Sequence, residues 1–349
     1  MRKALAFINP RLSTRNVGDI FIEDSTKRIL AYDPAASIDV DPRKPITQGH
    51  IDEINHREAA VILGTNLYYR EMFKPGRWMF RLEDLKEISV PIIPLGVGTT
   101  RHSGEDNGFD ADTLEQLKVI HSSCAMGSAR DPRTLEALLE AGISNVSMTG
   151  CLTLFRSLKS CWSLNDLRRS RRVVVTVRKG QRKNVRRLAN LLAARGLEVA
   201  VAAQQDKDLF LRRGIPLIRK PFPTVYEYDI RPYLKLVEES LGAIGWRLHG
   251  NMLHLAHGNA AMFFANCSRA ESFCRYFDLP CAYSEDKEDL PEPVIAEMVE
   301  RFLDPATFSA FPDRYARTYD ALVEFLDANG LAHNLHRRGE SEEGRAQGT

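Results

Sequence analysis

One short segment, residues 245–251 (Gly-Trp-Arg-Leu-His-Gly-Asn), places an arginine and a histidine between glycines. Apolar runs at residues 241–244 and 260–265 flank it, so the pattern predicts strand, turn, short helix and strand. Arg247 carries a planar fork of donors, and His249 titrates near neutral pH. At a strand end beside a helix N-terminus, this pair would suit a carboxylate or phosphate undergoing proton transfer. A buried pair that merely holds the turn together is equally compatible with these residues.

Composition excludes several classes of protein. The chain has 349 residues, enough for two domains, with 44% hydrophobic and 27% charged residues, as in ordinary globular proteins. A formal charge of +2 and the absence of a recognition motif argue against a nucleic-acid partner. No apolar run reaches the length of a membrane span, and the first one is too short for a signal peptide. Six cysteines without CxxC spacing indicate a reducing compartment. We therefore expect a cytoplasmic protein without a transmembrane segment.

Strands and helices alternate in two successive runs, separated by a polar segment between residues 155 and 172. This pattern predicts an α/β fold with two Rossmann-like, doubly wound lobes that face a cleft. We expect an N-terminal lobe over residues 1–165, a C-terminal lobe over 166–290, C-terminal helices over 291–336 and a disordered tail over 337–349. The main predicted strands are residues 4–8, 59–63, 90–95, 146–148, 173–178, 199–203, 216–218, 241–244 and 260–265.

Parallel sheets bind ligands where strands end, so residues just after strands are the candidate contacts. Asp19 is expected to cap a helix over residues 20–30. Arg178 ends the first strand of the second lobe, and one cleft could hold it together with Arg247 and His249. The other candidate substrate-binding residues are Asn16, Gly18, Asp19, Gly64, Thr65, Asn66, Gly98, Arg101, His102, Leu248, Gly250 and Asn251.

Four features, in this order and spacing, resemble the polysaccharide pyruvyl transferase family. They are Asn16-Val17-Gly18-Asp19 after the first strand, Ser128-Ala129-Arg130-Asp131 before a helix that stops at Gly142, Arg178, and Arg247-Leu248-His249-Gly250 before an apolar helix. The chain departs from the family pattern near Gly64 and Gly150, which concerns the acceptor pocket.

The resemblance implies a fold similar to B-type glycosyltransferases, with the acceptor on the first lobe and the donor on the second. It implies transfer of a pyruvyl group from phosphoenolpyruvate to two hydroxyls of a sugar or lipid-linked glycan, forming a ketal in polysaccharide or exopolysaccharide biosynthesis. It also implies active-site roles for Arg178, Arg247 and His249. A single histidine could act first as acid and then as base, so no metal or redox cofactor is expected. An oligomer is compatible with all of this.

Other interpretations stay open at this point. A nucleotide-sugar glycosyltransferase of the same fold would use Arg247 to grip a diphosphate, and a non-catalytic protein would only bind a sugar or anion. His249, His254 and His257 invite a metal, but no Asp, Glu or Cys joins them at ligand spacing.

Aromatic and cysteine residues allow two interpretations as well. Tyr68, Tyr69 and Trp78 could stack on a sugar or simply pack. We expect the thiols at positions 267, 274 and 281 to be buried.

Overall fold

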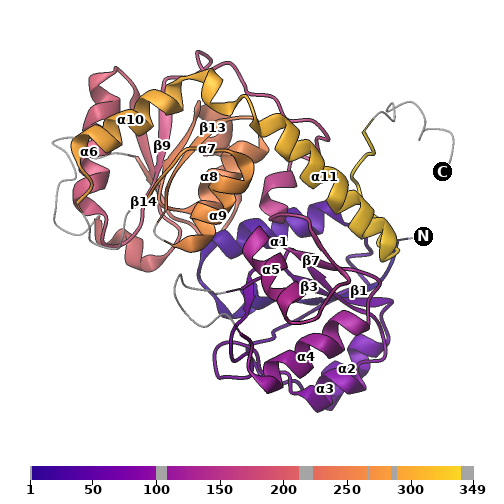
Figure 1. Cartoon of the computed structure of the whole chain (residues 1–349). Helices are drawn as coiled ribbons and strands as arrows, with labels where there is room; N and C mark the ends of the chain where they lie inside the picture. Colours follow the sequence, from indigo (N-terminus) through magenta and orange to yellow (C-terminus); the bar gives the residue numbers. More distant parts are fainter. Residues whose placement is uncertain (1, 100–107, 212–222, 266, 284–288, 339–349) are drawn as a thin grey trace.

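The computed structural model describes residues 2–99, 108–211, 223–265, 267–283 and 289–338. It forms two lobes, each built on a parallel sheet with helices packed against it (Figure 1). The prediction of two α/β lobes is therefore confirmed. The predicted strand at 216–218 and the predicted contacts Arg101 and His102 lie outside the described residues.

The first lobe contains a four-stranded sheet of order β2-β1-β3-β5, and every pair in it is parallel. Its strands are almost entirely apolar and buried, as expected for a parallel sheet covered on both faces. Two shorter parallel pairs, β4–β6 and β7–β8, lie beside it. The strands are β1 (Leu5–Ile8), β2 (Ile38–Val40), β3 (Ala59–Leu63), β4 (Asn66–Tyr68), β5 (Ile92–Leu95), β6 (Gly98–Thr99), β7 (Gly127–Ala129) and β8 (Val146–Met148). The helices are η1 (Pro10–Ser13), α1 (Val17–Ile29), α2 (Gln48–Asn55), α3 (Leu82–Glu87), α4 (Ala111–Ser122), α5 (Pro132–Glu140) and η2 (Leu152–Phe155).

The second lobe contains a six-stranded parallel sheet of order β11-β10-β9-β12-β13-β14. The order reverses at β9, so ligands are expected near its carboxyl end. The strands are β9 (Arg172–Thr176), β10 (Glu198–Ala202), β11 (Thr224–Val225), β12 (Gly242–Gly245), β13 (Ala260–Ala265) and β14 (Cys281–Tyr283). The helices are α6 (Arg182–Ala194), η3 (Asp206–Leu211), α7 (Arg231–Glu239), α8 (Leu248–Ala256), α9 (Ser268–Phe277), α10 (Glu292–Leu303), η4 (Pro305–Phe308) and α11 (Phe311–Ala328).

The last helix, α11, runs from the second lobe back to the first (Figure 1). After it, Asn329 donates a hydrogen bond to the Met126 carbonyl at 2.9 Å, and the Ala31 amide donates to the Ala332 carbonyl at 2.8 Å. The chain therefore crosses between the lobes twice. None of the helices among the described residues is both long and apolar enough to cross a membrane.

Two sequence expectations about local structure are wrong. Asn16, rather than Asp19, caps α1: its Oδ1 accepts from the Gly18 amide at 3.2 Å, and the helix begins at Val17. Of the three thiols expected to be buried, only Cys274 is; those at 267 and 281 are half-buried. The disordered tail stays a prediction: Arg337 and Arg338 form ion pairs with aspartates of α11, and residues 339–349 lie outside the described part.

Two of the three aromatic residues proposed for a sugar, Tyr68 and Trp78, are buried, whereas Tyr69 is half-buried with the Arg77 guanidinium 4.8 Å from its ring centroid. Trp78 is fully buried against Phe80. The Tyr68 hydroxyl lies 3.1 Å from His121 Nε2 inside the lobe. The packing interpretation holds for both residues, so neither is available to stack on a sugar.

Two buried histidines predict acid instability. Burial lowers the pKa of His121 to about 4, and burial together with His257 and Arg169 lowers that of His254 to about 3, from an ordinary 6.5. Between pH 6.5 and about 4, the rings bind protons in the unfolded chain but not in the folded chain. The free energy of unfolding therefore falls as the pH drops through this range. Each ring contributes at most about 1.4 kcal/mol per pH unit.

We expect His121→Gln to reduce this slope when the free energy of unfolding is measured by denaturant titration between pH 7 and 4.5. His50→Gln, at an exposed position, is the matched control and should leave the slope unchanged. Identical slopes in wild type and His121→Gln would contradict the assignment.

Candidate active site at the lobe interface

The two lobes touch where the N-terminus of α1 meets α8 and the loop after β10. The Val17 amide of α1 donates to the Gln204 carbonyl at 2.9 Å. A Cβ on Gly18 would lie 2.9 Å from His249 Nδ1 and 3.3 Å from Gln204 Oε1, so a larger residue would push the lobes apart. The predicted residue Gly18 therefore belongs to the interface because only hydrogen fits there.

His249 lies at this contact, in the first turn of α8, and is 8% exposed. Burial lowers its pKa well below 6.5, and Arg130, Arg269 and Arg247 lower it further. Its Nε2 has no hydrogen-bond partner among the described residues. The ring is thus neutral at pH 7. It presents one unused nitrogen, as do His121, His257 and His333, but of these four only His249 lies at the contact between the lobes beside Arg130 and Arg269.

Arg130, which follows β7 in the first lobe, is the most buried cation of the site at 5% exposure. Its Nη2 donates to Asn66 Oδ1, and its Nε lies 3.7 Å from Asp131. A Cβ on Gly98 would lie 2.4 Å from Nη2, so that glycine leaves room for the guanidinium. Its Nη1 is buried and bonds to nothing in the described part of the chain.

Arg269, in the first turn of α9, comes to the same place from the second lobe. Burial lowers its pKa, and Arg130 lowers it further, while Cys267 and Asp131 raise it. Helix α5, which follows Asp131, is in contact with helix α9, which contains Arg269. Arg130, Arg269 and His249 therefore form a cluster of cationic and titratable groups, which we call the interlobe cluster.

Arg247 has a carboxylate partner that its sequence position did not predict. Its guanidinium forms an ion pair with Asp208, and it also donates to the Val177 carbonyl and to Gln205 Oε1, each at 3.2 Å. Asp208 in turn accepts from the Lys179 and Gln204 amides. Because the Arg247 guanidinium already has a carboxylate partner, we assign it to positioning the loops around the site rather than to gripping an anion.

The first-lobe residues of the predicted site are partly brought together. Asp19 is 8% exposed and accepts from Thr65 Oγ1 at 3.3 Å. Burial raises its pKa, and Arg43, Thr14, Thr65 and Arg130 only partly offset the rise. A small pocket beside it is lined by Asn9, Pro10, Arg11, Asp19, Ile22, Glu23, Leu63, Gly64 and Thr65.

Several other predicted contacts serve the framework. Asn251 is fully buried: it accepts from Thr176 and donates to the Gly245 and Met262 carbonyls, joining three neighbouring strands. Gly250 abuts Gln204, and a Cβ there would lie 2.4 Å from its Nε2. Leu248 packs partly buried against the core, Asn16 caps α1, and Asn66 holds Arg130. A Cβ on Gly64 would lie 2.3 Å from the Gly96 carbonyl oxygen.

Arg178 lies two residues beyond β9 and is half-buried, so its predicted role stays a prediction. Sequence reasoning missed Arg269 and Asp208 altogether, and it used Arg130 only as a family feature. The available signal for Arg130 was an arginine directly before a helix-capping Asp-Pro pair; no comparable signal marks the other two. Across the described residues, no group of three or more His, Cys, Asp or Glu side chains could hold a metal ion.

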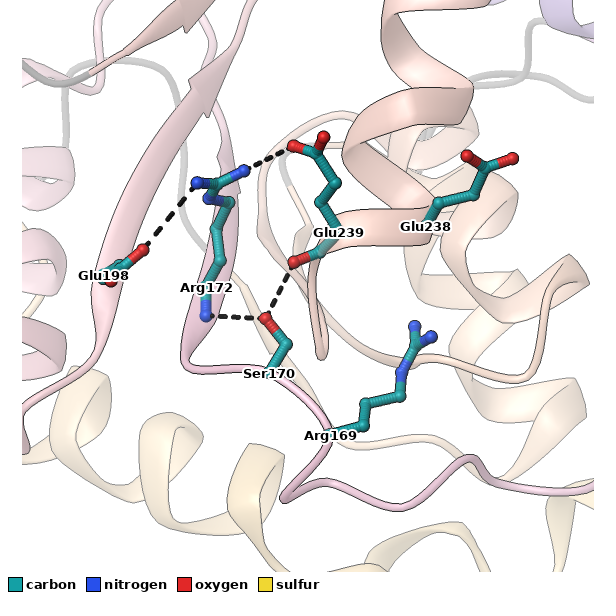
Figure 2. Close-up of a pocket in the computed structure, with 6 residues that line it drawn as sticks. All are labelled: Arg169, Ser170, Arg172, Glu198, Glu238 and Glu239. Atoms are coloured by element: carbon teal, nitrogen blue, oxygen red, sulfur yellow. Dashed lines mark hydrogen bonds and ion pairs between the residues drawn. The ribbon is translucent and has the colours of Figure 1, made fainter.

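A separate pocket lies far along the second-lobe strands from this site (Figure 2). It encloses about 390 Å³ at the amino ends of β9 and β10. Arg172 there lies 2.5 Å from Glu239 and 3.8 Å from Glu198, and Ser170 donates to the Glu239 carbonyl (Figure 2). Three glutamates face two arginines in this pocket, so carboxylates are in excess there, whereas in the interlobe cluster Arg130 and Arg269 outnumber the nearby carboxylate of Asp131.

Solved structures with the same two-lobed, GT-B-like architecture define the class of fold. A UDP-GlcNAc 2-epimerase from Neisseria meningitidis bound to UDP-GlcNAc matches with a TM-score of 0.55 and 12% identity, covering 94% of this chain and 100% of that one. The S. aureus MnaA–UDP structure matches with a TM-score of 0.53 and 9% identity, covering 97% and 100%. A UDP-GlcNAc 2-epimerase from Methanocaldococcus jannaschii gives 0.50 and 11%, covering 94% and 99%. At these identities the likeness concerns the fold alone.

The family follows from the sequence match. The model of the polysaccharide pyruvyl transferase family matches residues 16–268, well over half of the chain. The chain belongs to this family, whose members are transferases of polysaccharide biosynthesis. A search of curated proteins gave no match.

The Arg247–Asp208 pair generates a prediction about stability. Asp208→Asn removes one partner of a buried ion pair and should lower the free energy of unfolding by about 3–5 kcal/mol. Glu271→Gln breaks an exposed pair with Arg275 and should cost less than about 1 kcal/mol. Denaturant titration measures both, and equal effects would contradict the positioning role of the buried pair.

Proposed function

We propose that this protein transfers a pyruvyl group from phosphoenolpyruvate to two hydroxyls of a sugar in a polysaccharide or glycan precursor, forming a ketal. The observation that carries the proposal is the interlobe cluster. Arg130 and His249 hold buried nitrogens without partners among the described residues, and Arg269 lies half-buried beside them. A site with uncompensated donors and positive charge favours an anion.

Phosphoenolpyruvate matches this arrangement because it carries two anionic groups, a phosphate and a carboxylate. Arginine forks bind either group in bidentate fashion. Arg130 comes from the first lobe and Arg269 from the second, so one donor molecule between them would also draw the lobes together. The N-termini of α1 and α8 meet at the same place and add the partial positive charge of helix ends.

His249 is the proposed proton donor to the methylene carbon. In the free protein, burial and three arginines hold its pKa low, so the ring is neutral. A bound dianion would offset the arginine charges and favour the imidazolium. His249 would therefore take up its proton when phosphoenolpyruvate binds, so it could act as an acid only when this substrate is present.

Asp19 is the proposed base for the acceptor. It lies on the first lobe, next to Gly18, which contacts His249, and Arg130 acts on the pKa of both Asp19 and His249. Its pKa is raised, mainly by burial, which brings a carboxylate closer to the range useful for accepting a proton.

The proposed steps balance as follows. His249 protonates the methylene carbon, the first hydroxyl oxygen bonds to the central carbon, and Asp19 takes that hydroxyl's proton. The carbon–oxygen bond to phosphate then breaks, and phosphate leaves with the proton from Asp19. The second hydroxyl bonds to the same carbon and returns its proton to His249. Only proton transfers and anion binding are involved, so the proposal includes no metal or redox cofactor.

Product analysis tests the reaction. The full chain is incubated with phosphoenolpyruvate and a panel of sugar acceptors, and we expect phosphate release together with a mass gain on one acceptor. Release of a nucleoside diphosphate from nucleotide sugars would instead support a glycosyltransferase. Acceptor or anion binding without turnover would support a binding protein. Either result would overturn the proposal.

Donor binding is predicted to depend on the fork of Arg130. Arg130→Lys keeps the charge but loses the planar donors, so phosphoenolpyruvate affinity should fall by about 1–3 kcal/mol. Arg172→Lys makes the same exchange in the pocket of Figure 2 and should leave that affinity unchanged. Calorimetry decides: equal affinities in wild type and Arg130→Lys would remove Arg130 from the donor site.

Turnover is predicted to depend on His249. His249→Ala should fold, because the described residues give its Nε2 no hydrogen bond to lose, and should still bind phosphoenolpyruvate. Its rate should drop roughly a hundred- to ten-thousand-fold, as for loss of an acid–base group. His254→Ala, on the same helix, should mainly lower stability. Near-normal turnover in His249→Ala would contradict the assignment.

A further inference from the structure

A larger cavity of about 550 Å³ opens between the lobes along one side of α1. Its α1 residues recur every three or four positions and so lie on one helix face. The opposite wall comes from a second-lobe segment that follows β11. The lining residues are Arg11, Ile20, Glu23, Asp24, Lys27, Arg28, Tyr228, Asp229 and Ile230. We call this cavity the α1 groove.

The α1 groove adjoins the proposed acceptor side of the active site. Arg11 and Glu23 line both the groove and the small pocket that contains Asp19, Gly64 and Thr65. Burial raises the pKa of Tyr228, Arg11 lowers it, and Asp19 is close enough to raise it. The groove and the small pocket therefore share a wall, formed by the Arg11–Glu23 pair.

Tyr228 gives the groove an aromatic wall. It is one of the few large apolar side chains that stay exposed, at 43%, and the Arg11 guanidinium lies 5.4 Å from the ring centroid. An exposed ring beside charged hydrogen-bonding groups suits a ligand with apolar C–H faces and hydroxyl edges. Sugar rings have both features.

The charges of the groove favour an uncharged ligand. Three cations (Arg11, Lys27, Arg28) face three carboxylates (Glu23, Asp24, Asp229), so the lining is neutral overall. The carboxylates are also paired: Glu23 lies 3.2 Å from Arg11 and 2.9 Å from Lys27, and Asp24 lies 2.7 Å from Arg156. Neither a polyanion nor a polycation would find an excess of opposite charge here.

We propose that the α1 groove binds the sugar units of a neutral oligosaccharide acceptor beyond the unit that receives the pyruvyl group. That the oligosaccharide is an acceptor rests on the proposed function. The volume of the groove lies within the range of about 300–1,000 Å³ for pockets that enclose drug-sized ligands, so the groove can hold more than one sugar unit.

Binding without donor tests the groove independently of the reaction. Glucose-, galactose- and mannose-based oligosaccharides of one to four units are titrated into the full chain by calorimetry. We expect affinity to increase with length in at least one series. Tyr228→Ala should weaken the longest ligand of that series by about three- to tenfold while leaving the single sugar unchanged.

Two control variants isolate the aromatic ring. Tyr228→Phe keeps the ring and should retain the length dependence. Tyr283→Ala removes an exposed tyrosine that does not line the groove and should also retain it. Because Tyr228 is exposed, its truncation is not expected to unfold the chain.

Other outcomes overturn the assignment. Affinity independent of length, no binding in any of the three series, or equal length dependence in wild type and Tyr228→Ala would remove the groove from acceptor binding. Tighter binding of galacturonate oligomers than of galactose oligomers would overturn the neutral class. Length-dependent binding without phosphate release from phosphoenolpyruvate would leave the groove in place and reject pyruvyl transfer.

Discussion

The close approach of two helix N-termini across the lobe interface is the constraint on which the site depends. α1 and α8 can meet only because Gly18 has no side chain to collide with His249 and Gln204. That contact brings a loop of one lobe against a catalytic candidate of the other. It also directs two helix ends toward the same small volume, where their partial charges favour an anion.

The electrostatics of the interlobe cluster follow from this packing. Arg130 and His249 are buried with Arg269 half-buried beside them, and the nearby carboxylates of Asp131 and Asp208 are engaged with Arg130 and Arg247. Like charges held close in a poorly solvated place destabilise the empty protein and favour whatever negative ligand neutralises them. Besides burial, the same positive charge lowers the pKa of His249, because a proton on its ring would add another positive charge beside the arginines.

The lobes are joined by more than the site. Helix α11 runs from the second lobe to the first (Figure 1). The segment after it, through Asn329 and Ala332, forms hydrogen bonds with Met126 and Ala31 of the first lobe and so ties the two lobes together. Within the first lobe, Arg156 after η2 pairs with Asp24 of α1 beside the α1 groove. The contacts between the lobes fix the distance between them, and a donor and an acceptor would have to fit within that distance.

The sequence by itself determined the alternation of strands and helices, because continuous apolar runs bounded by glycine and capping residues are local signals. Residues 59–63, 146–148 and 260–265 are strands with the predicted bounds, and the Arg-Leu-His segment was identifiable together with the family. Leu248 and His249 lie in the first turn of α8, however, rather than in a turn before it. Only the tertiary structure decided that Arg247 pairs with Asp208, and that Arg130 and Arg269 meet beside His249. Burial and charge pairing arise between segments far apart in the chain, so no local pattern records them. The same limit applies over short distances in the sequence, because both Asn16 and Asp19 are residue types that can cap a helix. In the structure Asn16 caps α1, whereas Asp19 is buried and accepts a hydrogen bond from Thr65.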